Sequence, residues 1–150
     1  MRKLFTVVAG LLFATSAAFI AVAGPAPLVV GNNSGGIVEQ FLSQEQQLEA
    51  QGRGVVVRGR CASACTVVLH NPNVCVAAGG SFMFHSAFIA ADPEHGDFRR
   101  VQDDAQATAA MWGMYPPGVQ AWIMARGGLT ARPLNMSAQA AWSAGVRRCQ

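Results

Sequence analysis

The sequence predicts an α/β protein with a parallel sheet and crossover helices. Short apolar runs rich in valine at 27–30, 53–58 and 74–77 are typical of buried strands. Apolar residues recur at helical spacing over 37–50, and a short apolar segment over 64–69 follows a turn. Strands that alternate with helices in this order favour parallel pairing, because each helix returns the chain to the same end of the sheet.

The later elements follow from the same kinds of pattern. We expect a strand over 81–85, a surface loop over 86–97, and helices over 99–112, 117–125 and 138–143. Pro93, Gly96 and three acidic residues indicate the loop. Ser137 is a good N-cap for the last helix, which we expect to end at Gly145.

Composition and the N-terminal segment indicate one exported domain. The chain has 150 residues, 51% hydrophobic and 13% charged, which excludes a disordered chain. Arg2 and Lys3 precede an apolar run over 4–20 and the small residues Ala21-Val22-Ala23, which is typical of a signal peptide. We therefore expect a signal peptide over 1–23 and an α/β domain over 24–150. The alternative is an uncleaved membrane anchor over 4–23.

The charge of the predicted mature domain argues against nucleic acid as a partner. Without residues 1–23 the chain carries nine arginines and eight acidic residues, so its net charge is 9 − 8 = +1. The arginines are scattered rather than clustered in a basic patch. Lys3 is the only lysine in the sequence, so the predicted mature domain has none and a Ser-Lys catalytic dyad is excluded within it.

Four cysteines make disulfides plausible in an exported chain. They are Cys61, Cys65, Cys75 and Cys149, and their three possible pairings stay open. A zinc site is the competing interpretation. It is disfavoured because the spacing of Cys61 and Cys65 is not that of a zinc knuckle and no paired histidines follow.

A serine, a histidine and a glycine turn form the main functional signal. Ser63 lies between a predicted strand and a predicted helix, and His85 ends the predicted strand 81–85. A serine hydroxyl becomes a nucleophile when a nearby imidazole takes its proton. The turn at Gly35-Gly36 can present backbone N–H groups to a developing oxyanion. The competing interpretations are that Ser63 is only a helix N-cap and that His85 is structural.

These residues belong to segments that together resemble a known family. The segments are NSGGIV (33–38), GRCASAC (59–65), FMFH (82–85) and MSA (136–138), followed by WSAGV (142–146). In order and spacing they are similar to the Clp protease proteolytic subunit. They are most similar to exported, periplasmic Clp-like proteins of bacteria, in which the serine is flanked as Cys-x-Ser-x-Cys. The resemblance covers roughly 28–146.

The resemblance implies a ClpP/crotonase-like fold of repeated ββα units with a parallel sheet core, short at its N-terminal end. It implies a periplasmic serine peptidase in which Ser63 is the nucleophile, His85 is the general base, and Gly36 and Ala64 form the oxyanion hole. We expect no cofactor or metal. The expected partners are peptide or protein substrates and further copies of the chain. An ATP-dependent unfoldase is not expected, because a periplasm has no ATP.

The third member of the family's triad is missing at its usual place. The position that matches the family's aspartate is Pro133, so the acid stays unknown, with Asp92 and Asp97 as candidate substitutes. This departure favours a second hypothesis, a non-catalytic exported binding or scaffold module. Crotonase-like acyl-thioester chemistry is a third, less favoured by export.

Overall fold

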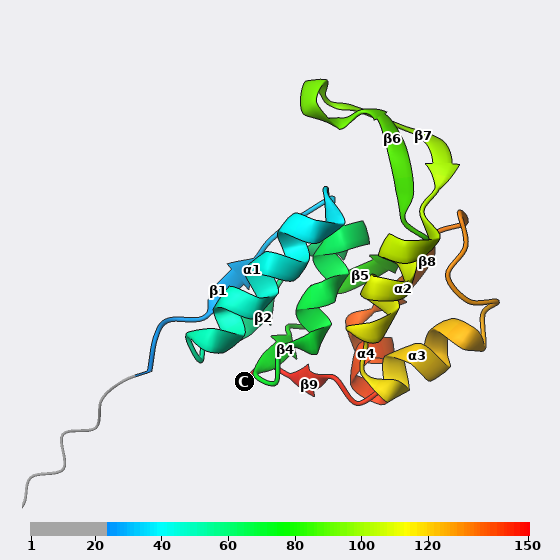
Figure 1. Cartoon of the computed structure of the whole chain (residues 1–150). Helices are drawn as coiled ribbons and strands as arrows, with labels where there is room; N and C mark the ends of the chain where they lie inside the picture. The colour runs from blue at the N-terminus through cyan, green and yellow to red at the C-terminus, as the bar shows by residue number, and fades with distance from the viewer. Residues whose placement is uncertain (1–23) are drawn as a thin grey trace, which may run out of the picture.

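In the computed structural model, which describes residues 24–150, helix α1 (Val38–Ala50) and the short 3-10 helix η1 (Ser63–His70) separate the strands of the first half of the chain (Figure 1). The strands are β1 (Leu28–Val30), β2 (Val55–Val57), β3 (Arg60–Ala62), β4 (Val74–Val76), β5 (Ser81–Phe84), β6 (Phe88–Asp92), β7 (Asp97–Asp103), β8 (Leu134–Ser137) and β9 (Arg147–Arg148). The other helices are α2 (Ala105–Gly113), α3 (Pro117–Met124) and α4 (Ala138–Ser143), with the short 3-10 helix η2 (Pro93–His95).

The predicted parallel sheet is present. Within residues 24–150, one sheet has the strand order β1-β2-β4-β9, and all its neighbours pair in parallel. The central strand β2 pairs with β1 on one side and β4 on the other, and its Val55 and Val57 are fully buried. Helices α1 and η1 pack against each other. The α/β class predicted from the apolar runs is therefore confirmed.

A second sheet carries the candidate site residues. It has the order β3-β5-β8, with β3 parallel to β5 and β8 antiparallel to β5. The chain passes from β2 into β3 at Gly59, where an added Cβ would lie 2.5 Å from the Gly31 carbonyl oxygen. Only glycine allows the two segments to approach so closely. Strand β3 ends just before Ser63, and strand β5 ends just before His85. Because the two strands are parallel, both residues follow the sheet at the same end of its strands.

The region after His85 differs from its prediction. Strands β6 and β7 form an antiparallel hairpin closed by η2, and this hairpin projects from the body of the molecule (Figure 1). The predicted loop over 86–97 is therefore wrong. The predicted helix over 99–112 is wrong for residues 99–103, which belong to β7. Aromatic and β-branched residues on both strands favour extended structure, and they outweigh the loop signals: Phe88, Ile89, Phe98 and Val101.

Helix α2 accordingly begins later than predicted. Its N-cap is Asp104, whose Oδ1 accepts a hydrogen bond from the Ala107 N–H at 2.9 Å. The last helix follows its prediction, because the Ser137 hydroxyl caps α4 by accepting from the Ala140 N–H at 3.2 Å. Both capping residues satisfy N–H groups that have no partner within their helix.

Two disulfides select one of the three possible pairings. Cys61 bonds to Cys65, and Cys75 bonds to Cys149, which ties the C-terminal strand β9 to β4. Because all four sulfur atoms are in disulfides, none is a thiolate ligand, and the zinc interpretation is wrong. Two disulfides in a small domain fit a protein exported to an oxidising compartment.

The predicted signal peptide over 1–23 and the alternative anchor over 4–23 lie outside the described residues. Among the residues from 24 onward, no helix combines the length and apolar character needed to cross a bilayer.

Glu45 is a buried acid on the inner face of α1. Its side chain is 1% exposed, and neither carboxylate oxygen accepts a hydrogen bond from any described residue. Burial raises the pKa of Glu45 to about 7. The neighbouring Asn71 side chain opposes this rise of the pKa in part, and the charge of Glu49 adds to the rise.

Replacing Glu45 with glutamine is expected to stabilise the protein at pH 8 and not at pH 4. The unfolded carboxyl titrates near 4.5 and the folded one near 7, so the folded state holds the proton more tightly and stability falls as pH rises between these values. Glu45→Gln removes that loss, and we expect a gain of about 1–3 kcal/mol at pH 8. Urea unfolding at both pH values measures it, with exposed Glu94→Gln as the control. Equal effects of Glu45→Gln at both pH values would contradict the assignment.

Candidate active site

Ser63 occupies a strained turn between β3 and η1. Its φ is +55°, and within residues 24–150 it is the one non-glycine residue with a positive φ. Such backbone strain costs about 1–3 kcal/mol and is common at functional sites. In α/β-hydrolases, a sharp strand-to-helix turn exposes the hydroxyl of the catalytic serine. The N-cap of η1 is Ala62, and the cap has no side-chain hydrogen bond, so the N-cap interpretation of Ser63 is wrong.

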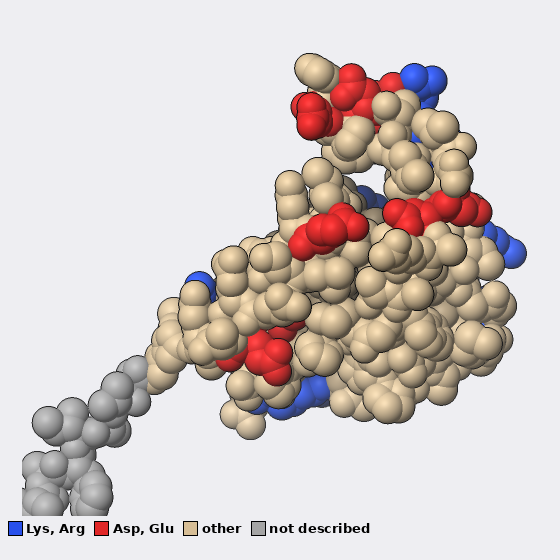
Figure 2. Space-filling model, viewed as in Figure 1, with Lys and Arg blue, Asp and Glu red and all other residues tan. Residues whose placement is uncertain are grey.

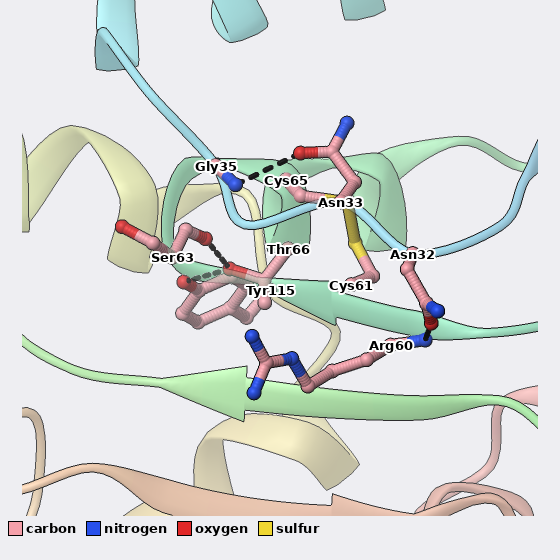
Figure 3. The surroundings of a disulfide bond; sticks show 9 residues. All are labelled: Asn32, Asn33, Gly35, Arg60, Cys61, Ser63, Cys65, Thr66 and Tyr115. Atoms are coloured by element: carbon pink, nitrogen blue, oxygen red, sulfur yellow. Dashed lines mark hydrogen bonds between the residues drawn. A yellow bond between two sulfur atoms is a disulfide. The ribbon is translucent and has the colours of Figure 1, made fainter. Parts of the chain in front are cut away.

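The turn is held by a disulfide and by a chain of hydrogen bonds. The Cys61–Cys65 disulfide joins strand β3 to the first turn of η1 (Figure 3). The Thr66 hydroxyl donates to the Ser63 carbonyl oxygen at 2.6 Å, so the Tyr115 hydroxyl donates to Thr66 at 2.7 Å. Burial raises the pKa of Tyr115, which keeps its phenol protonated as a donor. Figure 3 shows the Ser63 hydroxyl pointing away from this hydrogen-bonded group.

The predicted glycine turn lies against the serine turn. Asn33 pairs with β3 through two backbone hydrogen bonds, and its side chain accepts from the Gly35 N–H at 2.8 Å. An added Cβ at Gly35 would lie 2.6 Å from the Ala62 carbonyl oxygen and 2.7 Å from the Ser63 Cβ. The φ of Gly35 is +84°, which glycine adopts without strain. Glycine at 35 therefore permits this close contact.

Two backbone N–H groups beside Ser63 are available as donors. In the described part of the chain, neither the Gly36 N–H nor the Ala64 N–H donates to another protein group. The Ala64 N–H is at the start of η1, where helix N–H groups have no partner within the helix. Gly36 lines the same cleft as Ser63, whereas Ala64 is fully buried directly after it. Gly35, rather than Gly36, makes the close contact with the serine turn.

His85 is oriented by a backbone carbonyl. Its Nδ1 lies 2.8 Å from the Ser86 carbonyl oxygen. Because a carbonyl oxygen only accepts, Nδ1 carries the proton, and in the neutral ring Nε2 carries the lone pair. That tautomer is the one a general base needs, and in serine proteases an aspartate normally selects it.

No acid occupies the aspartate's place. Strand β8 pairs with β5 so that Leu134 lies opposite Phe84, and Pro133, the residue that matches the family's aspartate, directly precedes Leu134. The two candidate substitutes lie in the hairpin and bind other residues. Asp92 contacts His95 at 2.9 Å, and Asp97 binds Arg99 at 2.6 Å. The prediction that either of them supports His85 is therefore wrong.

Ser63 and His85 line one cleft of about 460 Å³. The cleft is the hollow between the hairpin and the body in Figure 2. Its walls are mostly apolar, and the hairpin contributes Phe88, Ile89, Ala90, Pro93 and Phe98. The Ser63 hydroxyl makes no hydrogen bond with any residue from 24 to 150, the His85 ring included. Active-site hydrogen bonds of this kind often tighten only when substrate is bound.

The cleft also has an acidic character. Glu39 and Asp104 are among its lining residues, and none of the described lining residues is lysine or arginine. Figure 2 shows further acidic side chains on the projecting hairpin. A cleft lined by one sign of charge attracts groups of the opposite sign.

Sequence reasoning missed two groups of functional interest. One is the Ser86 carbonyl, since a backbone atom leaves no signal in the sequence. The other is the hairpin, whose aromatic residues line the cleft. The aromatic and β-branched residues Phe88, Ile89, Phe98 and Val101 were the available signal for the hairpin.

No known protein-family model matches the chain, and a search of curated proteins finds no significant match.

Proposed function

We propose that the protein is an exported, Clp-like serine hydrolase, a peptidase that acts on short or unfolded peptides. One observation carries the proposal: the strained turn at Ser63 and the oriented ring of His85 share one cleft. The parallel sheet and the paired glycine and serine turns are compatible with a ClpP/crotonase-like fold. The two disulfides support a periplasmic location.

In the proposed reaction, His85 Nε2 takes the proton of the Ser63 hydroxyl as Oγ bonds to the peptide carbonyl carbon. The N–H groups of Gly36 and Ala64 donate to the carbonyl oxygen while it gains negative charge. The protonated imidazole then gives its proton to the amine nitrogen as the C–N bond breaks, leaving an acyl ester on Ser63. A water molecule that loses its proton to the same imidazole hydrolyses the ester and restores the serine.

The walls of the cleft suggest which peptides it accepts. Aromatic side chains on the hairpin offer apolar surface, including Phe88 and Phe98. Glu39 and Asp104 favour cationic groups and disfavour carboxylates. The proposed substrates are therefore peptides with apolar or basic side chains near the cleaved bond, rather than acidic ones.

A fluorophosphonate is expected to form a covalent adduct on Ser63 in the wild-type protein. Ser63 Oγ would bond to phosphorus and fluoride would leave, with His85 taking the proton. Peptide mapping by mass spectrometry locates the adduct. Apolar or basic peptides should slow its formation more than acidic peptides of equal length. A protein that stays unmodified, or is modified only at other residues, would disprove the proposal.

A non-catalytic binding module is the second candidate. It is favoured by Pro133 at the place of the aspartate and by the absence, among the described residues, of a hydrogen bond from the Ser63 hydroxyl to His85. This function predicts that the cleft binds peptides without cleaving them and that the fluorophosphonate leaves Ser63 unmodified. Peptide binding by calorimetry, measured beside the adduct experiment, separates the two functions.

A further inference from the structure

The hydrogen bond that orients His85 leads directly to a residue of the hairpin. The Ser86 carbonyl oxygen accepts from His85 Nδ1 at 2.8 Å and from Arg100 Nη2 at 3.0 Å. A carbonyl oxygen has two lone pairs, so these two donors use its full capacity. His85 and the β7 residue Arg100 are thus joined through a single atom.

The Arg100 guanidinium is itself fixed by several contacts. Its Nη1 pairs with the Asp103 carboxylate and lies 3.3 Å from the Ser86 hydroxyl oxygen. The guanidinium carbon lies 4.5 Å from the centre of the Phe88 ring. Because the guanidinium is planar and rigid, contacts at its edge and on its face determine its orientation.

The peptide unit between Ser86 and Ala87 is held at both ends. Arg100 binds its carbonyl oxygen, and the Ala87 N–H donates to the Thr108 hydroxyl on α2 at 2.9 Å. Thr108 in turn donates to the Asp104 carbonyl at 2.6 Å. A peptide plane bound on both sides cannot turn its carbonyl away from the His85 ring.

We propose that Arg100 is the positioning residue that takes over the orienting role of the missing aspartate. It fixes the Ser86 carbonyl, and this carbonyl keeps His85 in the tautomer with the proton on Nδ1. Asp103 neutralises the guanidinium, so that Arg100 can lie near the imidazole without repelling the positive charge that forms during catalysis. The role in catalysis rests on the proposed hydrolase function, whereas the effect on the tautomer does not.

The hairpin would then have two tasks. It supplies apolar walls to the cleft through β6 and β7, and it delivers the arginine that orders the base.

The test compares Arg100→Ala with Arg99→Ala. Arg99 is the neighbour of Arg100 on β7, and its guanidinium binds Asp97 at the hairpin. The first readout is the ¹⁵N spectrum of histidine-labelled protein at pH 8, with His85 assigned from its loss in His85→Gln. We expect the Nδ1–H tautomer in wild type and Arg99→Ala, and a mixture of both tautomers in Arg100→Ala.

The second readout is the rate of fluorophosphonate labelling. We expect Arg100→Ala to label roughly 10- to 100-fold more slowly, which is less than the about 10⁴-fold loss on replacing a triad aspartate with asparagine. Millimolar guanidinium should restore part of the rate in Arg100→Ala and none in His85→Gln. Arg100→Lys, which keeps a charged donor, should give an intermediate labelling rate. It replaces Arg100→Ala in the comparison if the alanine variant disturbs the hairpin.

An unchanged tautomer in Arg100→Ala would overturn the assignment, as would equal losses of labelling in the two alanine variants. If the wild type does not label at all, the hydrolase proposal fails, and the tautomer spectrum still decides whether Arg100 positions His85.

Discussion

Replacing Ser63 with alanine is expected to reduce fluorophosphonate labelling and peptide hydrolysis to background. The hydroxyl lies at a strained turn, is free of hydrogen bonds to the described residues, and lines the cleft. Removing it takes away the atom that forms the covalent bond. His85→Gln is expected to lower the hydrolysis rate by a factor on the order of 10²–10⁴, because this is about what a positioned general base contributes. Labelling rates and the release of a fluorogenic group measure both variants.

Ser34→Ala is the matched control for these two variants. Ser34 lines the same cleft but does not lie at the strained turn. We expect it to label at close to the wild-type rate. Far-UV circular dichroism and intact disulfides confirm that each variant is folded. Equal labelling of wild type and Ser63→Ala would show that another residue is the nucleophile, or that the cleft has no catalytic serine.

Gly35→Ala is expected to destabilise the protein by about 3 kcal/mol or more and to abolish labelling. The new Cβ would lie 2.6 Å from the Ala62 carbonyl oxygen and 2.9 Å from the Ala64 nitrogen, both backbone atoms that cannot move without distorting the serine turn. The φ of +84° adds strain for any residue with a Cβ. Urea unfolding with the disulfides intact measures the loss of stability.

Gly36→Ala separates close packing from the proposed oxyanion role. The nearest atom to a Cβ at Gly36 is a Phe41 ring carbon at 3.4 Å, and the φ of Gly36 is not in the left-handed region. We expect a change in stability below about 1 kcal/mol. Labelling should still fall, because the methyl group would extend into the cleft where the substrate carbonyl approaches. Similar stability losses for the two glycine variants would contradict the close contact at Gly35.

The candidate nucleophile and base could be located from the sequence because each follows a strand signal. The valine run over 55–57 and the segment GRCASAC place Ser63 after a strand, and the run over 81–84 does the same for His85. Their approach to one another depends on the pairing of β3 with β5, which brings the two strand ends to the same edge. The positive φ of Ser63 likewise depends on contacts with Gly35 and the Cys61–Cys65 bond.

The partner of His85 could not be predicted in the same way. The acidic residues that the sequence offers as substitutes, Asp92 and Asp97, bind their own neighbours at the hairpin. The group that contacts the ring is the Ser86 carbonyl, and every residue type has such a carbonyl. The hairpin could not be predicted because Pro93 and Gly96 are also typical of loops. In the structure these two residues form the tight end of the hairpin.

The amino-acid sequence by itself determined the α/β class, the buried valine strands, and a serine and a histidine at the ends of two strands. Only the tertiary structure decided which cysteines pair, that residues 88–103 form a hairpin, and that Arg100 reaches the carbonyl beside His85. The physical reason is the range of the interactions. Apolar periodicity and caps act over a few neighbouring residues, whereas disulfides and hydrogen bonds between distant segments form only where packing brings those segments together.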